Sequence, residues 1–370
     1  MNITITKDQI QAGLMVVQNA VSSRSSLPIL SNVLLKAEGE LLELTASDLD
    51  MTVTCSVKAV VNQPGATTLP AKRLFQIIKE MPNSDLIIES DNDERCKIEC
   101  GSIKFTIYGL SAADYPKLQT IKDNRKITIK QEKFRELLRR TSFAASQEEG
   151  RHLLNSVYVE LGEHDVTVVA TDGRRLVLAQ EEMDIPEHCR GGIILPIRVV
   201  NEISRLLGVK GDVELTIFEN FVRFVIRDDG ELPKVLFTKL IEGSYPNYRQ
   251  VVPKESKYRI ELHREEFLSA LKRAEIVTSE RQSSVKLSFS ENLMTVTTNT
   301  PEVGDFTENV AVKFNGEEFS IAFNPVYLIE PLSVLTEDVV YFELTDNLSP
   351  GVLKVNNPFL YVVMPLRLQE

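Results

Sequence analysis

The chain has 370 residues, of which 43% are hydrophobic and 26% charged, and its net charge at neutral pH is −11. This composition is that of a globular protein and excludes a disordered, collagen-like or disulfide-stapled chain. The negative net charge argues against a protein that binds nucleic acid over its whole surface, but it does not exclude one basic surface on an acidic body. No run of about 20 apolar residues and no signal sequence is present, so we expect a cytoplasmic protein without membrane contact.

The first predicted feature is an alternating strand that leads into an amphipathic helix. In ITITKDQI and the residues behind it, Ile10, Leu14 and Val17 fall at helical spacing. The pattern occurs three times, at 3–10, 127–134 and 259–267. The anchor positions Ile10, Phe134 and Phe267 are 124 and 133 residues apart, which indicates a threefold repeat.

A second strand-to-helix step follows in each repeat. These steps span 67–81, 192–207 and 321–335, with prolines at Pro70, Pro196 and Pro325. Proline is favoured in the first turn of a helix, because its missing N–H has no partner there. The third helix also contains Pro331, which predicts a kink or a break.

Alternating strands occupy the rest of each repeat. Two helices surrounded by strands indicate helices on one side of antiparallel sheets. The predicted fold is therefore α+β, with three tandem copies of a two-helix antiparallel-sheet domain. We place the domains at 1–125, 126–253 and 254–370.

The four cysteines do not predict a metal site. Cys96 and Cys100 lie in the alternating segment CKIEC, an even number of residues apart, so both should face the same side of a strand. Neither a second pair nor a histidine at ligand spacing follows them. We expect buried, reduced thiols and no bound metal.

The predicted helices are more basic than the rest of the chain. Six helical segments sum to a net charge of +6, which leaves −17 for the remainder. Lysine and arginine also gather at helix ends and exposed faces for ordinary reasons. Combined with the threefold repeat, the asymmetry favours a basic helix-lined surface on an acidic body.

Several segments, in a fixed order along the chain, resemble one protein family. They are SLPILSNVLL (26–35), ATDGRRLVL (170–178), SYPNYRQVVP (244–253), FNPVYL (323–328) and YVVMPLRL (361–368). Together with the repeats they extend over essentially the whole chain, which resembles the bacterial DNA polymerase III β subunit, the sliding clamp. The resemblance implies the DNA clamp fold, in which two subunits join head to tail as a ring with helices inside and sheets outside.

The resemblance implies a DNA polymerase processivity factor that is not an enzyme and needs no cofactor. It would encircle duplex DNA without reading its sequence. Its implied partners are a second copy of the chain, the clamp loader complex, the α subunit of DNA polymerase III, and other polymerases and repair proteins with clamp-binding peptides. These partners would share one hydrophobic groove per subunit.

The implied groove lies between the second and third domains and suits a short peptide of apolar and aromatic residues. Its implied lining is Leu154, Thr171, Gly173, Arg175, Leu176, Pro246, Val251, Asn324, Tyr327, Leu348, Val362, Met364, Pro365, Leu366 and Arg367. From the residues alone, TDGRRL also fits a plain turn between strands, and MPLRL fits a closing edge strand.

The resemblance also implies a set of residues that face DNA. They are Arg24, Arg73, Arg135, Arg139, Arg140, Arg151, His152, Arg198 and Arg205. The chain departs from the family's usual pattern at Gln250, where a basic residue is common, and at His152 and Leu153, where aromatic residues are common. Gln369 and Glu370 extend past the usual end.

The implied subunit interface joins the first domain to the third domain of the partner. Phe105, Ile276 and Val277 match the family's apolar contacts, although ordinary core packing stays open for each. The strand at KFTIYG would otherwise leave an exposed edge. Because the two surfaces differ, the implied interface is heterologous and closes as a ring.

Two other classes of function are alternatives to a clamp. For an enzyme, the candidate carboxylates are Asp48, Asp50 and Asp172, but Asp48 and Asp172 occupy equivalent positions, which indicates turn chemistry. The histidines are scattered, and no phosphate-binding loop or nucleophile motif is present. The second alternative is an interaction scaffold that keeps the groove and never encircles DNA.

Overall fold

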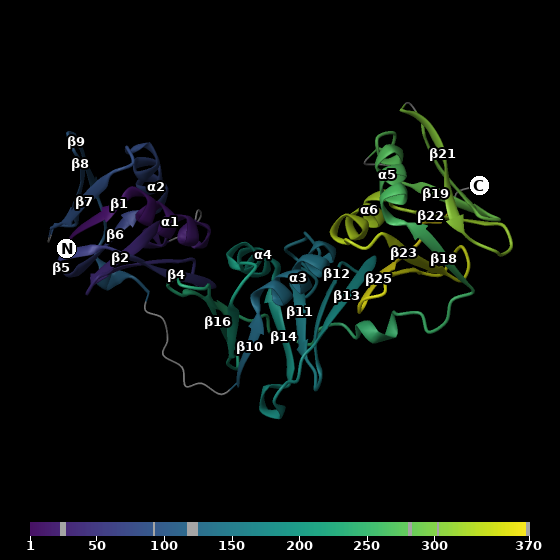
Figure 1. The fold of residues 1–370 in the computed structure, drawn as a ribbon, viewed down its shortest axis with the longest axis horizontal. Coiled ribbons are helices and arrows are strands. Elements are labelled where there is room, and N and C mark those ends of the chain that lie inside the picture. Colours follow the sequence, from purple (N-terminus) through teal and green to yellow (C-terminus); the bar gives the residue numbers. More distant parts are fainter. Residues whose placement is uncertain (23–26, 92, 117–124, 280–282, 302, 368–370) are drawn as a thin grey trace. The chain divides into compact units, whose positions relative to one another are not determined.

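The computed structural model describes residues 1–22, 27–91, 93–116, 125–279, 283–301 and 303–367 (Figure 1). They form two compact units. Unit 1 combines Met1–Arg135 with Asn201–Leu240, and unit 2 combines Glu136–Val200 with Ile241–Glu370. Each unit therefore contains one junction between consecutive repeats.

Each repeat has the predicted order of strand, helix, strands, helix and strands. Repeat 1 consists of β1 (Asn2–Thr6), α1 (Lys7–Val17), β2 (Asn32–Glu38), β3 (Leu41–Ser47), β4 (Met51–Lys58), β5 (Val60–Gln63), β6 (Gly65–Pro70), α2 (Ala71–Glu80), β7 (Asp85–Ser90), β8 (Arg95–Cys100) and β9 (Ile103–Tyr108). Repeat 2 consists of β10 (Arg125–Lys130), α3 (Gln131–Thr141), β11 (Ser156–Leu161), β12 (Asp165–Thr171), β13 (Arg175–Glu182), β14 (Gly191–Pro196), α4 (Ile197–Leu206), β15 (Asp212–Ile217), β16 (Phe221–Arg227) and β17 (Lys234–Lys239). Repeat 3 consists of β18 (Tyr258–His263), α5 (Arg264–Glu275), β19 (Val285–Ser290), β20 (Leu293–Thr300), β21 (Gly304–Lys313), β22 (Phe319–Phe323), α6 (Pro325–Val334), β23 (Val339–Leu344), β24 (Gly351–Lys354) and β25 (Phe359–Val363).

The strands pair antiparallel and continue from one repeat into the next. Unit 1 holds a sheet in the order β5-β1-β7-β8-β9 and a second in the order β10-β15-β16-β17-β4-β3-β2-β6. Unit 2 holds a sheet in the order β14-β11-β12-β13-β25-β24-β23-β18-β21-β20-β19-β22. We call the β4–β17 pairing junction 1 and the β13–β25 pairing junction 2.

Straight rows of paired residues identify equivalent positions in the three repeats. One row crosses the first strand and then the last three strands of each repeat. In the three repeats this row is Ile3–Ile88–Ile98–Phe105, Ile127–Leu215–Phe224–Leu236 and Ile260–Phe342–Leu353–Tyr361. Phe105, Leu236 and Tyr361 are therefore equivalent. Their positions end the row at the last strand of each repeat.

Both junctions have the same register. Ala46 pairs with Val53 in repeat 1, and Ala170 pairs with Val177 in repeat 2, 124 residues further on in each case. At junction 1 Val53 lies opposite Leu236, and at junction 2 Val177 lies opposite Tyr361. Equivalent residues thus meet twice, so the chain joins its repeats in one repeated way.

The predicted break at Pro331 does not occur, because α6 continues through this residue. Pro331 cannot donate a hydrogen bond to the carbonyl of Tyr327, four residues earlier. The hydroxyl of Tyr361, on β25, donates to that oxygen instead, at 2.5 Å. A buried side chain from the neighbouring sheet therefore replaces the missing helical bond.

The cysteines are free and buried, and Cys96 and Cys100 share the buried face of β8, as predicted. Burial raises the pKa of the Cys55 and Cys96 thiols to about 12. Within the described ranges, the side chains form no group of three or more potential metal ligands. None of the helices in those ranges is long and apolar enough to span a membrane.

Candidate functional site

The segment TDGRR forms a tight turn between β12 and β13. The Asp172 carboxylate accepts hydrogen bonds from the backbone N–H groups of Arg174, at 2.8 Å, and Arg175, at 3.0 Å. Gly173 has a φ of 88°, which a residue with a side chain rarely adopts. In repeat 1, Asp48 accepts the equivalent bond from Met51 at 2.8 Å. The turn chemistry predicted for these two aspartates is confirmed.

Arg175 is buried at the start of β13 and does not reach the surface. Its guanidinium forms ion pairs with Asp172, at 3.1 Å, and with Glu330 of α6. It also donates to the carbonyl of Phe143 at 3.0 Å and lies over the ring of Tyr327, 4.5 Å from its centroid. Arg175 therefore connects the turn, the segment that follows α3, and α6 as a positioning residue.

A buried apolar cluster lies where β13, β25 and β24 run side by side. Leu176 lies opposite Val362, which in turn lies opposite Val352. The cluster, which we call the apolar platform, consists of Val169, Leu176, Tyr248, Val352 and Val362. Two of the predicted groove residues, Leu176 and Val362, thus form its centre.

Other predicted groove residues from the same unit are exposed apolar side chains. The exposed fractions are 51% for Val251, 68% for Leu348, 44% for Met364 and 39% for Leu366. The backbone fixes the last two, because Met364 donates to the carbonyl of Arg174 at 2.9 Å and Leu366 to that of Ala322 at 2.7 Å. The terminal segment is therefore anchored to the turn before β13 and to β22, which fits the closing edge strand left open above.

The remaining predicted groove residues have mixed positions. Asn324 caps α6 by accepting from the N–H of Val326 at 3.0 Å, and Thr171 is buried in the turn. Leu154 is half-buried, and a side chain at Gly173 would lie within 4.0 Å of it. Pro246 and Arg367 are exposed, whereas Pro365 is half-buried.

Three tyrosines in or beside the platform are not among the residues predicted from the sequence. Tyr158 and Tyr245 stack with ring centroids 5.0 Å apart. Tyr248 is buried, and its hydroxyl donates to Glu160 at 2.6 Å, while Arg249 pairs with the same carboxylate at 2.8 Å. Burial and the Glu160 carboxylate raise the pKa of Tyr248. The segment SYPNY contained the signal, but its periodicity did not show which rings turn inward.

The arginines predicted to face DNA differ in how exposed they are. Arg73 on α2, Arg135 on α3 and Arg198 on α4 are exposed. In the loop before β11, His152 is exposed, and Arg151 is exposed and pairs with Glu148 at 2.9 Å. Arg24 lies outside the described residues.

Arg139, Arg140 and Arg205 are held by groups of the protein itself. Glu136 accepts from Arg139 at 2.7 Å and from Arg140 at 2.6 Å, and Arg140 also reaches Glu337 at 3.0 Å. The side chain of Arg140 is only 12% exposed. Arg140 therefore lies largely inside unit 2, where two carboxylates neutralise its charge.

Arg205 caps the carboxyl end of α1 in unit 1. It donates to the carbonyls of Met15, at 3.0 Å, and Val16, at 2.7 Å, and it pairs with the buried Glu202. Glu202 also accepts from Asn19 at 3.0 Å. Cations at helix carboxyl ends are stabilising, which gives Arg205 a structural task at junction 1.

Comparison with known proteins identifies the class of protein. The chain matches family models for the N-terminal, central and C-terminal domains of the DNA polymerase III beta subunit, over residues 1–119, 128–247 and 249–367. The "Beta sliding clamp" of Chlamydia trachomatis is 33% identical over this whole chain and 88% of its own length.

Two solved structures have the same fold. The DNA polymerase III subunit beta of Pseudomonas aeruginosa matches 99% of this chain and all of its own, with a TM-score of 0.92 and 32% identity. The beta sliding clamp of C. crescentus matches both chains completely, with a TM-score of 0.91 and 34% identity. These structures and the repeats define a three-domain DNA clamp fold.

The chain belongs to the DNA polymerase III beta subunit family, the sliding clamps. It is therefore a DNA polymerase processivity factor and not an enzyme. The prediction drawn from the sequence is confirmed at this level.

Proposed function

We propose that two copies of this chain form a head-to-tail ring around duplex DNA and that each copy binds partner peptides over the apolar platform. The observation that carries the peptide site is the buried platform at junction 2 with exposed apolar residues in the adjoining segments. A peptide that covers the exposed apolar side chains gains roughly 25 cal/mol per Å² of apolar area that it buries.

Exposed apolar residues at two separate places support the ring. Phe105 on β9 is 40% exposed, and Ile276, just after α5, is 77% exposed. Val277 beside it is half-buried. The two surfaces belong to different repeats, so one subunit would present Phe105 while the other presents Ile276 and Val277.

The DNA surface rests on the exposed helical arginines. Arg73, Arg135 and Arg198 attract phosphates without reading bases, which suits a protein that slides. We assign Arg139, Arg140 and Arg205 no large share, because carboxylates or carbonyls already hold them.

The proposed partners are the clamp loader complex, the α subunit of DNA polymerase III, and other polymerases and repair proteins, and the proposed location is the cytoplasm. The solved C. crescentus relative has polyethylene glycol bound at its proposed beta-motif tethering region. This supports a ligand-binding surface in the relative, and we propose that partners share the corresponding surface of this chain.

Retention on DNA tests the ring. The clamp is loaded by its matching loader on nicked circular plasmid, which is then cut once. Loss after cutting supports topological linkage, whereas retention on both forms contradicts it. Charge reversal of Arg73, Arg135 and Arg198 should reduce loading, while reversal of the exposed strand lysines Lys36, Lys126 and Lys286 should not.

Fluorescence anisotropy tests the peptide site with a labelled clamp-binding peptide from the polymerase α subunit. Leu348→Ser combined with Met364→Ser should weaken binding by about tenfold or more, because each removes exposed apolar area. The matched control is Leu49→Ser with Val60→Ser, two equally exposed apolar residues of unit 1. Equal effects of both pairs would contradict the assignment.

A further inference from the structure

Both junctions have a glutamate at the same position in the second helix of the later repeat. At junction 1 it is Glu202 of α4, and at junction 2 it is Glu330 of α6. Each is the sixth residue of a helix of ten residues, so the two carboxylates start from equivalent places in the fold. The junctions differ in the groups that these carboxylates bind.

At junction 1 the glutamate is held by helical segments. Glu202 is buried, pairs with Arg205 of its own helix, and accepts a hydrogen bond from Asn19 at 3.0 Å. Asn19 lies two residues beyond the last residue of α1. Both partners belong to the helical layer, so at this junction the glutamate joins one helix to another.

At junction 2 both of these partners are replaced. Ser333 takes the position of Arg205, and its hydroxyl donates to the carbonyl of Ile329 in the same helix at 2.7 Å. Phe143, two residues beyond the end of α3, takes the position of Asn19, and its side chain has no hydrogen-bond donor. The glutamate of α6 therefore takes its partner from another element.

That partner is Arg175, at the start of β13 and next to the platform residue Leu176. The guanidinium lies over the ring of Tyr327, 4.5 Å from its centroid. Tyr361 holds the backbone of the same residue, because its hydroxyl donates to the Tyr327 carbonyl at 2.5 Å. Glu330 thus connects α6 to the strand of the platform and to the residue of α6 that the resemblance places in the groove.

We infer that Glu330 is a positioning residue of the peptide site, which holds the Arg175 guanidinium over Tyr327 and so fixes the ring that receives the partner peptide. The inference rests on the peptide site proposed above and adds a residue to it. Only 7% of the Arg175 side chain is exposed, so its charge serves this cluster rather than the solvent. Glu330 acts on the peptide through these two side chains.

The hydrogen bonds of the guanidinium show why Glu330 is needed. Asp172 accepts from Nε of Arg175 at 3.1 Å, and the carbonyl of Phe143 accepts from Nη2 at 3.0 Å. Glu330 accepts from Nη1. A buried cationic donor without an acceptor is unfavourable, so without Glu330 the guanidinium should turn toward water. The ring of Tyr327 would then lose the cation that covers it.

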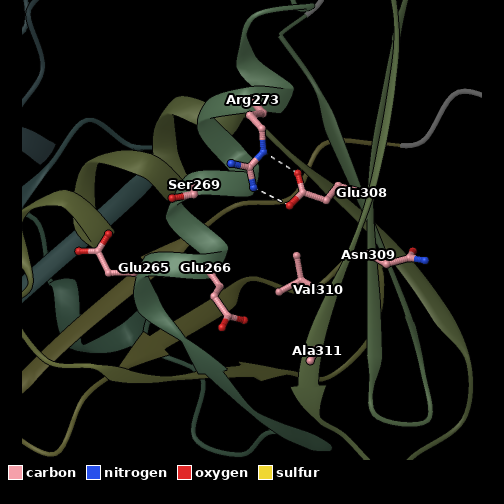
Figure 2. A pocket seen from close by; sticks show the side chains of 8 residues that line it. All are labelled: Glu265, Glu266, Ser269, Arg273, Glu308, Asn309, Val310 and Ala311. Carbon is pink, nitrogen blue, oxygen red and sulfur yellow. Dashed lines mark hydrogen bonds and ion pairs between the residues drawn. The ribbon is translucent and has the colours of Figure 1, made fainter.

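A second arginine–glutamate pair of unit 2 provides a matched control. Figure 2 shows Arg273 of α5 and Glu308 of β21 beside a pocket that both residues line, joined by bonds of 2.7 and 2.5 Å. Their side chains are 50% and 28% exposed, so water can replace either partner. Neither residue belongs to the platform or to the predicted groove.

Fluorescence anisotropy of the full-length protein with the labelled clamp-binding peptide tests the inference. Glu330→Ala should raise the dissociation constant by about tenfold, because the ring would hold its binding orientation only about a tenth of the time. Glu330→Gln should raise it less, since the amide oxygen still offers Arg175 an acceptor at the same length. Glu308→Gln should leave the dissociation constant unchanged, and an equal effect of this control overturns the inference.

A second background separates positioning from a general loss of stability. In Tyr327→Ala the ring is absent, so Glu330→Ala should change the dissociation constant by less than about twofold. An equal loss in both backgrounds overturns the inference. Urea unfolding shows whether each variant is folded, and where Glu330→Ala is not, Glu330→Gln in the same two backgrounds decides.

The outcomes also separate this inference from the peptide site itself. A wild-type protein that does not bind the peptide overturns the proposed peptide site. A wild-type protein that binds it, with folded Glu330 variants of the same affinity, overturns only the role of Glu330.

Discussion

Junctions 1 and 2 share one backbone register and differ in the side chains that it displays. At junction 2, the row Leu176–Val362–Val352 is apolar and forms the centre of the platform. The equivalent row at junction 1 is Thr52–Phe237–Arg223, which is half-buried and mixed in polarity. The sheet therefore supplies a frame at both junctions, and only the side chains turn one of them into a candidate binding site.

The helix ends at the two junctions also differ in polarity, and here junction 2 is the more polar of the two. Junction 2 has a charged network of Glu136, Arg139, Arg140 and Glu337. The equivalent residues at junction 1 are Ala12, Met15, Val16 and Val209. A four-residue charged network thus joins the helices where the sheet row is apolar, while Arg205, with Glu202 and Asn19, joins them where the row is mixed in polarity.

The largest expected effect comes from exchanging the residue at the start of the junction strand. Arg175 and Met51 are equivalent and both buried. Arg175→Met should destabilise unit 2 by about 3 kcal/mol, because it leaves Asp172 and Glu330 without their partner. Urea unfolding measures the loss, and hydrogen exchange should locate it in α6. The exposed neighbour Arg174→Met is the control, and equal stability of both variants would show the ion pairs to be dispensable.

A smaller effect should follow from removing the hydroxyl that replaces the bond lost at Pro331. Tyr361→Phe leaves the Tyr327 carbonyl without its donor and should cost about 1 kcal/mol. In a Pro331→Ala background the helical N–H can return, so the same change should cost less. A double-mutant cycle followed by thermal unfolding compares the two. Equal costs in both backgrounds would show that the Tyr361 hydroxyl does not compensate for the N–H that Pro331 lacks.

The smallest expected effect is a dependence on acid pH that only junction 2 should show. Burial alone would raise the pKa of Glu136, but hydrogen bonds from Arg139 and Arg140 outweigh burial and lower the pKa to about 2. A carboxyl group whose pKa is lower in the folded protein than in the unfolded protein stabilises the fold at pH values above its unfolded pKa. This contribution is lost as the pH falls through about 4 toward 2. Since Glu136 is partly exposed, we expect less than about 1 kcal/mol. Denaturation at several pH values should show a shallower acid loss for Glu136→Gln, and parallel curves would contradict this origin.

The sequence predicted the repeated order of elements well, because amphipathic helices and alternating strands carry local signals. It did not show how α6 continues through Pro331, because the compensating donor lies on β25, and it did not show that Arg140 is neutralised by Glu337. Both interactions join residues far apart in the chain, which a local pattern does not contain. For the same reason the resemblance named Leu176 and Val362 but not Tyr248, whose ring turns inward only in the folded unit.

The contrast between the rows has a consequence for stoichiometry. The equivalent row of repeat 1 ends at Lys97 and Thr106, which are both polar. Three repeats per subunit therefore yield a single docking position. A closed ring would have a valence of two, one for each copy, so that two partners can be held at once and a third must wait for one to leave.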